Sequence, residues 1–194
     1  HTPGHVEMYT CGPTVYHFAH IGNLRSYIME DVLEKALRYV GYDVKRVMNI
    51  TDVGHLSSDA DTGEDKMLKG AKREHKTVME VAKFYADAFF EDCRKLNIKK
   101  ADVVEPATHC IPEFIHMIEV LLKKGYAYQA GGNVYFDTSR LEDYFVFSSA
   151  VEKEQLQVGV RDDVEEDENK RNKNDFVLWF TKSKFEDQAL KWDS

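Results

Sequence analysis

Residues that can do chemistry gather in one short stretch of this sequence, from Tyr9 to Asn23, which reads YTCGPTVYHFAHIGN. Cys11 supplies a thiol, and a cysteine thiolate is a good zinc ligand. Hydroxyl groups and imidazoles follow at Thr14, Tyr16, His17 and His20. The stretch therefore combines candidate ligands for a metal, a phosphate and a polar substrate.

The flanking residues predict that this stretch is a loop between a strand and a helix. Val6 and Met8 indicate a short apolar strand, which Gly12-Pro13 breaks. An amphipathic helix is predicted from the apolar run Leu24, Ile28, Leu33, Leu37 and Val40. Unpaired amides and the dipole attract anions to a helix N-terminus, and Gly22 lets an anion approach the backbone. We therefore expect a phosphate site at the start of this helix.

The next residues complete a strand, helix, strand unit. Gly41 ends the helix, and residues 44–50 form a second strand candidate. Such a unit has parallel strands and a right-handed crossover, so the loops after both strands emerge at one carboxyl edge. Cys11 and Thr51 are therefore expected to face one pocket.

The rest of the chain predicts two more helices and then a change to hairpin character. The helices are predicted at residues 77–97 and 111–124, joined by a polar connection at 99–109. A hairpin is predicted at 126–137, where Gly131-Gly132-Asn133 supplies the turn, and a last strand at 176–180. Residues 54–65 indicate an exposed acidic loop, and its spacing excludes an EF-hand because Gly63 is fifth rather than sixth. Residues 164–168 lie in an acidic, weakly ordered segment.

Composition limits the class of protein. With 194 residues, 43% of them hydrophobic, the chain can bury a sizeable core as one domain or two. Its net charge of −8 means that any RNA contact needs a local basic patch. Cys11, Cys93 and Cys110 are an odd, widely spaced set, which favours reduced thiols. Because no signal peptide or membrane-spanning run is visible, we expect a soluble cytoplasmic protein without a membrane partner.

Several sequence runs together resemble one enzyme family. The run CGPTVYHFAHIGN is similar to the signature of the cysteinyl-tRNA synthetases, which are class I aminoacyl-tRNA synthetases, with Asn23 in place of the last histidine of the HIGH tetrapeptide. Asn49-Ile50-Thr51-Asp52 and Arg171-Asn172 with the following DFVLW run are also typical of that family. Trp192-Asp193-Ser194 resembles the start of its next block. The resemblance spans nearly the whole chain.

The resemblance implies an α/β fold, specifically the first half of a Rossmann-like nucleotide-binding domain with parallel strands. It assigns residues 1–105 to that half, 106–175 to a mixed α+β connective insertion, and 176–194 to the return toward the second half. It also implies activation of cysteine with ATP and Mg²⁺ to cysteinyl-adenylate, followed by transfer to the tRNA for cysteine. No DNA partner is expected. The family's KMSKS loop, further zinc ligands and anticodon-binding helices are not in this sequence, so we expect the chain alone to be inactive.

The same resemblance assigns roles to individual residues. Catalytic roles fall to His20 and Asn23, and zinc binding to Cys11. ATP or adenylate contacts are expected from Gly12, Pro13, Thr14, His20, Gly22, Asn23 and Ser26. Cysteine contacts are expected from Cys11, Gly12, Thr14, Asn49 and Thr51. Tyr16 and Asp52 are weaker candidates, and Asn23 cannot carry the charge of a histidine.

Other interpretations remain open at this point. A glycine or hydroxyl at a turn is commonly structural, which applies to Gly12, Gly22 and Thr14, and Thr51 can simply cap a strand end. Cys93 and Cys110 are interpreted as packing residues. A related ligase that passes cysteine to an amino sugar, in a mycothiol-type pathway, has the same opening motif. A non-catalytic synthetase-like module that binds nucleotide or metal is the alternative from another class.

Overall fold

A computed structural model describes residues 2–53, 71, 76–144, 146, 167–181, 190 and 192–193. The described residues form two compact units that divide between Cys110 and Ile111. The predicted acidic loop at 54–65 lies outside the described residues, as does most of the predicted acidic segment at 164–168. No helix in the described part of the chain is long and apolar enough to cross a membrane.

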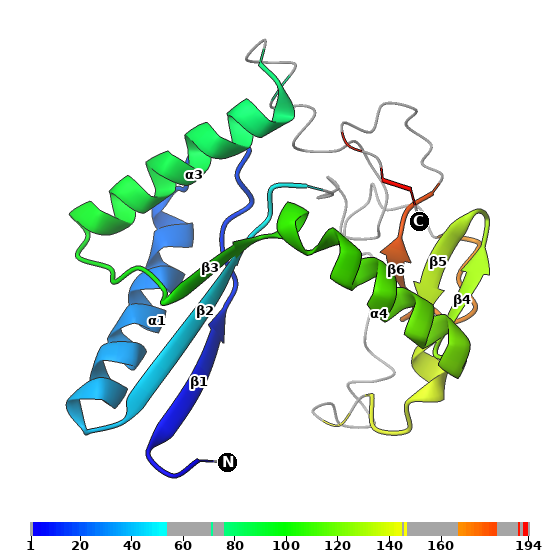
Figure 1. Ribbon diagram of the computed structural model, residues 1–194, viewed down its shortest axis with the longest axis horizontal. Helices are drawn as coiled ribbons and strands as arrows, with labels where there is room; N and C mark the ends of the chain where they lie inside the picture. The colour runs from blue at the N-terminus through cyan, green and yellow to red at the C-terminus, as the bar shows by residue number, and fades with distance from the viewer. Residues whose placement is uncertain are drawn as a thin grey trace. The chain divides into compact units, whose positions relative to one another are not determined.

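The first unit contains a parallel sheet in the order β1-β2-β3 (Figure 1). The strands are β1 (His5–Thr10), β2 (Asp43–Ile50) and β3 (Val103–Pro106). Both neighbouring pairs are parallel, with Thr10 and Val104 lying beside Met48 on its two sides. The predicted α/β fold with parallel strands is therefore confirmed.

Two helices cover one face of this sheet (Figure 1). They are α1 (Ile21–Tyr39) and α3 (Val78–Lys95), both close to their predicted bounds. Gly41 follows α1 with a φ of 96°, a conformation in which glycine avoids the steric cost of a Cβ atom. Thr77 begins α3 in a capping box with Glu80. Local sequence signals thus define both helices.

The sequence interpretation missed β3, which lies within the predicted polar connection at 99–109. The strand has four residues and ends at Pro106, so its own pattern is weak. It forms because β2 offers an edge for parallel pairing, from Val47 opposite Val103 to Ile50 opposite Pro106. A short 3₁₀ helix, η1 (Ala107–Cys110), follows directly.

The predicted apolar stripe of α1 is wrong as a description of its buried face. The buried residues are Leu24, Tyr27, Asp31 and Glu34. Leu33 is 53% exposed and Val40 is 66% exposed, although both belong to the predicted stripe. The helix turns two carboxylates inward because both have partners there: Glu34 pairs with Arg46 and Lys99, and Asp31 accepts a hydrogen bond from the Lys99 amide.

Glu34 is the centre of a buried ion cluster. Its side chain is fully buried, and its Oε2 lies 3.1 Å from Nε of Arg46, which is 1% exposed and belongs to β2. Its Oε1 lies 2.9 Å from Arg38 of the same helix and 3.0 Å from Nζ of Lys99. The cluster therefore joins α1 to β2 and to the segment that leads into β3.

Two further carboxylates tie the same parts together through main-chain amides. Asp102 accepts a hydrogen bond from the Arg46 amide at 2.8 Å, and Asp31 accepts one from the Lys99 amide at 2.8 Å. The Arg46 guanidinium also donates to the Lys99 carbonyl. These bonds satisfy polar groups that burial would otherwise leave unpaired.

Apolar contacts complete the core of the first unit. The cluster comprises Leu24, Tyr27, Met48, Phe89, Cys93, Ile98 and Ala101. Burial raises the pKa of the Cys93 thiol to about 11, with Asp92 adding in the same direction. Cys93 is therefore a protonated packing residue at neutral pH.

The second unit consists of a helix and an antiparallel sheet in the order β4-β5-β6. The elements are α4 (Ile111–Lys124), β4 (Ala127–Ala130), β5 (Asn133–Phe136) and β6 (Phe176–Trp179), and a short 3₁₀ helix, η2 (Thr138–Arg140), follows β5. Gly131 and Gly132 form the hairpin turn, both with positive φ. The helix, the hairpin and the last strand agree with their predictions. The boundaries 1–105, 106–175 and 176–194 stay a prediction, and β6 belongs to the sheet of this unit.

Asp175 fixes the position of the residues just before β6 through hydrogen bonds. It is 1% exposed and accepts hydrogen bonds from the Tyr128 hydroxyl at 2.7 Å, the Thr138 amide at 2.9 Å and the Asn172 amide at 3.0 Å. Burial alone would raise the pKa of Asp175, but these bonds lower it below its usual value. The carboxylate thus ties residues 172–175 to the hairpin and to η2.

We predict that Glu34→Gln destabilises the chain strongly. The change leaves Arg46 buried without its charged partner, which costs about 3–5 kcal/mol of unfolding free energy. Urea unfolding followed by circular dichroism measures the loss. The matched control is Glu91→Gln, which removes an exposed pair with Arg94 at 2.7 Å and should leave stability almost unchanged. Equal losses in the two variants would contradict the importance of the buried cluster.

Candidate functional site

The loop after β1 lies along the end of β2. Thr14 and Thr51 form an isolated parallel bridge. The Thr51 amide donates to the Pro13 carbonyl at 3.1 Å, and the Val15 amide donates to the Thr51 carbonyl at 3.2 Å. Val15 is 1% exposed and anchors this part of the loop. The loop is therefore an extension of the sheet at its carboxyl edge.

Asn49 joins the loop, the strand end and Tyr9. Its Oδ1 accepts hydrogen bonds from the Gly12 amide and from the Tyr9 hydroxyl, both at 2.9 Å. Its Nδ2 donates to Oγ1 of Thr51 at 3.2 Å. The side chain thus orients the loop and the Thr51 hydroxyl together.

Gly12 approaches β2 more closely than any other residue type can. A Cβ atom at this position would lie 1.6 Å from the carbonyl oxygen of Asn49. Real Cβ atoms do not come that close to a backbone oxygen, so the close approach requires glycine. Gly12 therefore has a definite structural role, whatever it contacts in a complex.

Cys11 lies next to this junction with an exposed thiol. Burial raises the pKa of Tyr9, and the nearby Cys11 adds to that shift. In the part of the chain that the structure describes, no three His, Cys, Asp or Glu side chains come together to bind a metal ion. Cys11 thus offers an exposed thiol beside this junction, without a complete set of metal ligands among the described residues.

Aromatic packing fixes the middle of the loop against α3. The Phe18 ring lies edge-on to Tyr85, with centroids 5.0 Å apart, and also contacts Phe84 at 5.9 Å. The His17 ring stacks on Tyr85 at 6.1 Å. His17 therefore packs on α3.

His20 caps α1 at its N-terminus. Its Nδ1 accepts a hydrogen bond from the Gly22 amide at 3.1 Å, and Oδ1 of Asn23 accepts one from the His20 amide at 3.1 Å. Because an amide can only donate, Nδ1 has no proton in this arrangement, and the neutral ring carries its proton on Nε2. The cap therefore presents an N–H donor at Nε2.

The structure brings the predicted site residues into two groups. The first lies at the carboxyl edge of β1 and β2 and comprises Cys11, Gly12, Pro13, Thr14, Asn49 and Thr51. The second lies at the start of α1 and comprises His20, Gly22, Asn23 and, one turn later, Ser26.

Two other residues differ from the sequence interpretation. Asp52 is 4% exposed and accepts hydrogen bonds from the Thr108 amide at 3.0 Å and hydroxyl at 2.6 Å, so it secures η1. Tyr9 is 64% exposed and bonded to Asn49, yet sequence reasoning did not assign it to the site. Its place two residues before Cys11 was the available signal, because alternate residues of an extended chain point to the same side.

Comparisons with known proteins agree with one another. A family model described as the catalytic domain of class I (C) tRNA synthetases matches residues 1–194. A protein from Treponema denticola named cysteine–tRNA ligase is 53% identical over 191 residues, which cover 98% of this chain and 38% of that protein. One of the same name from Borrelia garinii is 50% identical, covering 97% of this chain and 39% of the relative. The chain thus spans less than two fifths of either relative.

Solved structures support the fold alone. A ternary complex of a LeuRS with tRNA and LeuAMS from Agrobacterium radiobacter matches with a TM-score of 0.50 and 19% identity. The match covers 72% of this chain and 17% of that one. The architecture is therefore shared with a protein of distant sequence.

We predict that Gly12→Ala distorts the sheet edge. The added methyl group collides with backbone, which cannot yield locally, so the unfolding free energy should fall by about 1–3 kcal/mol. Amide signals of Asn49 and Thr51 in a ¹H–¹⁵N spectrum should shift. Gly22→Ala is the control, because its Cβ would meet only the His20 ring, at 2.9 Å, and a ring can move. A harmless Gly12→Ala would show that the close approach is not required.

We predict that Asn23→Leu weakens the cap while Asn23→Asp keeps it. Leucine is similar in size but cannot accept from the His20 amide, whereas a carboxylate can. Hydrogen exchange of the His20 amide should accelerate by about tenfold in the leucine variant, the scale of a lost helix cap. Imidazole ¹⁵N shifts should show the Nε2–H form in the wild type and in Asn23→Asp. An unprotonated Nε2 in the wild type would contradict the assigned tautomer.

Proposed function

This chain belongs to the family of class I (C) tRNA synthetase catalytic domains, and from that premise we propose that its parent protein activates cysteine with ATP and transfers it to the tRNA for cysteine. The proposal concerns the whole parent protein. The chain itself covers only 38–39% of the length of the two relatives compared. Two relatives named cysteine–tRNA ligase, at 50–53% identity, support it. The observation that carries it is the convergence of Cys11, Thr14 and Thr51 at the sheet edge where such folds bind nucleotides.

The proposed first step is an in-line attack by the cysteine carboxylate on the α-phosphate of ATP. A new bond forms between carboxylate oxygen and phosphorus, the bond to the β-phosphate oxygen breaks, and pyrophosphate leaves with its Mg²⁺. No protein nucleophile is required. The protein contributes orientation and stabilisation of the charge that develops on phosphate oxygens.

His20 is proposed as the donor to that phosphate. Its Nδ1 is engaged by Gly22, so its Nε2–H is the group available to an oxygen of ATP. The first amides of α1 and its dipole favour an anion at the same place. Gly22 and Ser26 line this approach to the adenylate.

Asn23 is proposed to act through His20. Its Oδ1 bonds the His20 amide, so it supports the position of the imidazole without carrying charge. The adenylate contacts proposed for Gly12, Pro13 and Thr14 depend in turn on the bonds that join this loop to Asn49 and Thr51.

Cys11 is proposed as one ligand of a zinc ion. Its thiol is exposed, the next residue, Gly12, is bonded to Asn49, and a thiolate suits zinc. The described residues provide no complete set, so the other ligands would come from the parent protein. When bound, zinc would select a thiol over a hydroxyl, because it binds sulfur strongly.

The remaining parts of the proposal concern location and partners. We infer a cytoplasmic enzyme that uses cysteine, ATP and tRNA and needs neither a membrane nor DNA. Transfer of cysteine to an amino sugar is the competing outcome for the second step, and direct charging of tRNA with labelled cysteine distinguishes the two.

We predict that the full-length parent catalyses ATP–pyrophosphate exchange with cysteine and not with serine. Cys11→Ala should abolish the exchange or reduce it severely, since it removes a metal ligand. His20→Ala should slow it by about 100-fold, the usual effect of losing one donor to developing charge. The 194-residue chain alone should show no exchange. A folded, zinc-loaded parent without exchange would instead favour a non-catalytic binding module.

A further inference from the structure

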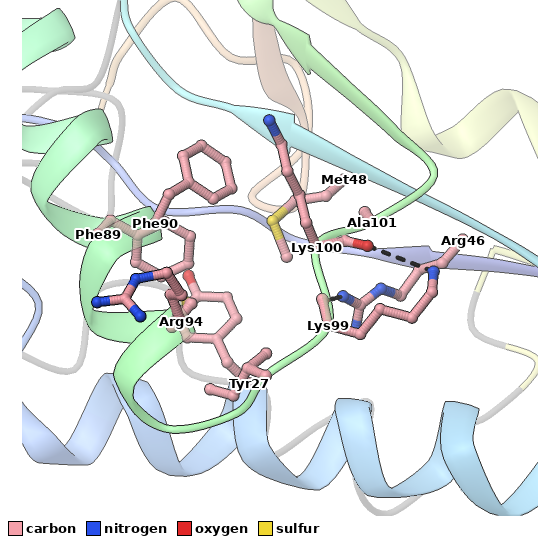
Figure 2. Close-up of a pocket in the computed structure, with 11 residues that line it drawn as sticks. Tyr27, Arg46, Met48, Phe89, Phe90, Arg94, Lys99, Lys100 and Ala101 are labelled. Carbon is pink, nitrogen blue, oxygen red and sulfur yellow. Dashed lines mark hydrogen bonds between the residues drawn. The ribbon is translucent and has the colours of Figure 1, made fainter.

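A cavity of about 300 Å³ opens in the first unit, on the side of the sheet that carries the helices. Figure 2 shows it between α3, α1 and the segment 98–101. Its volume is at the lower end of the range of small-molecule pockets. None of the residues predicted to bind cysteine, ATP or zinc lines it.

The floor of the cavity is apolar and firmly packed. It is formed by Tyr27, Met48, Phe89, Cys93, Ile98 and Ala101, each at most 9% exposed. Phe89 lies edge-on to Tyr27 with ring centroids 4.8 Å apart. Because these side chains belong to the core cluster, the floor exists before any ligand arrives. Flat aromatic groups are the natural occupants of such a floor.

All of the charged residues that line the cavity are cationic. Arg46, Arg94, Lys99 and Lys100 line it, and none of the described residues that line it is acidic. Cys93 adds no negative charge at neutral pH, since burial raises its thiol pKa to about 11. The lining of the cavity is thus positively charged, although the chain as a whole has a net charge of −8.

Three of these cations already have carboxylate partners, and one does not. Arg46 and Lys99 pair with Glu34, and Arg94 pairs with Glu91. Lys100 lies over the Phe90 ring, with Nζ 4.9 Å from its centroid, and forms no ion pair with any described residue. Lys100 also lines the cavity, so its ammonium group is available to an anion there.

We propose that this cavity is a binding site for a small aromatic monocarboxylate, with the ring system on the Tyr27–Phe89 floor and the carboxylate at Lys100. The site is separate from the proposed cysteine and ATP sites, and the proposal does not depend on them. Lys100 recognises the charge, and the apolar floor recognises the ring. Tyr27 belongs to α1, so a bound ligand contacts the helix that His20 begins.

The test uses 2-naphthoate as the probe and neutral 2-naphthamide as its matched analogue. Binding to the full-length parent protein is followed through the ¹³C-methyl signals of Met48 and Ala101. A ligand of this size should bind with a Kd on the order of 1 mM. The amide should bind about tenfold more weakly, because it lacks the charge that Lys100 recognises.

Three variants decide between this site and unspecific binding. Ala101→Leu fills the cavity and should abolish the Met48 shift. Lys100→Gln should bring the affinities for naphthoate and naphthamide close together. Lys83→Gln is the control, since Lys83 pairs with Asp87 on α3 and does not line the cavity, and it should change nothing. Unshifted Met48 and Ala101 methyls at 10 times the expected Kd, or equal affinity of the wild type for both probes, would overturn the proposal. Should Ala101→Leu fail to fold, the comparison of Lys100→Gln with Lys83→Gln still decides.

Discussion

The first unit depends on the neutralisation of Glu34, a carboxylate that has no exposed surface. A buried charge is costly unless it is paired and hydrogen-bonded, and here three cations from three segments surround it. The pairing of Glu34 with Arg46 can form only when α1 packs at one particular position along β2. Since a helix and a strand are stiff, fixing them at Glu34 and Arg46 also fixes the far ends where His20 and Thr51 lie. The charge cluster thus sets the register on which the candidate site depends.

The carboxyl edge of the sheet adds a second constraint, of shape rather than charge. Gly12 can approach the Asn49 carbonyl only because it has no side chain, and Asn49 then bonds both Gly12 and Thr51. The loop is consequently defined by main-chain contacts, while its side chains at Cys11 and Thr14 are left for other partners. Phe18, packed on Tyr85, secures the same loop against α3. A polar site of this kind is preorganised by groups that do not themselves react.

Sequence reasoning located the elements better than their buried faces. Turn glycines and capping residues are local signals, so α1, α3, α4 and the β4–β5 hairpin were predictable, and the motif around Cys11 indicated which residues would converge. Apolar spacing failed for α1, because partners distant in sequence, Arg46 for Glu34 and the Lys99 amide for Asp31, allow these two carboxylates to be buried. Strand β3 failed for a related reason, since its four residues become a strand only beside β2. Both failures concern long-range partners, which no local pattern contains.

Asn23 shows how a side chain without charge can support the geometry of a helix cap. The position is the third of α1, where the useful property is an acceptor that reaches back to the cap amide, and an amide oxygen provides it as well as a charged group would. Its Nδ2 donates to no residue that the structure describes, so the contribution of Asn23 to the cap comes from Oδ1 alone. The neutral imidazole of His20, oriented by the Gly22 amide, does not need a positive charge at position 23 to be held in place. If the parent protein stabilises charge on a phosphate here, position 23 contributes orientation, and any additional positive charge has to come from other residues.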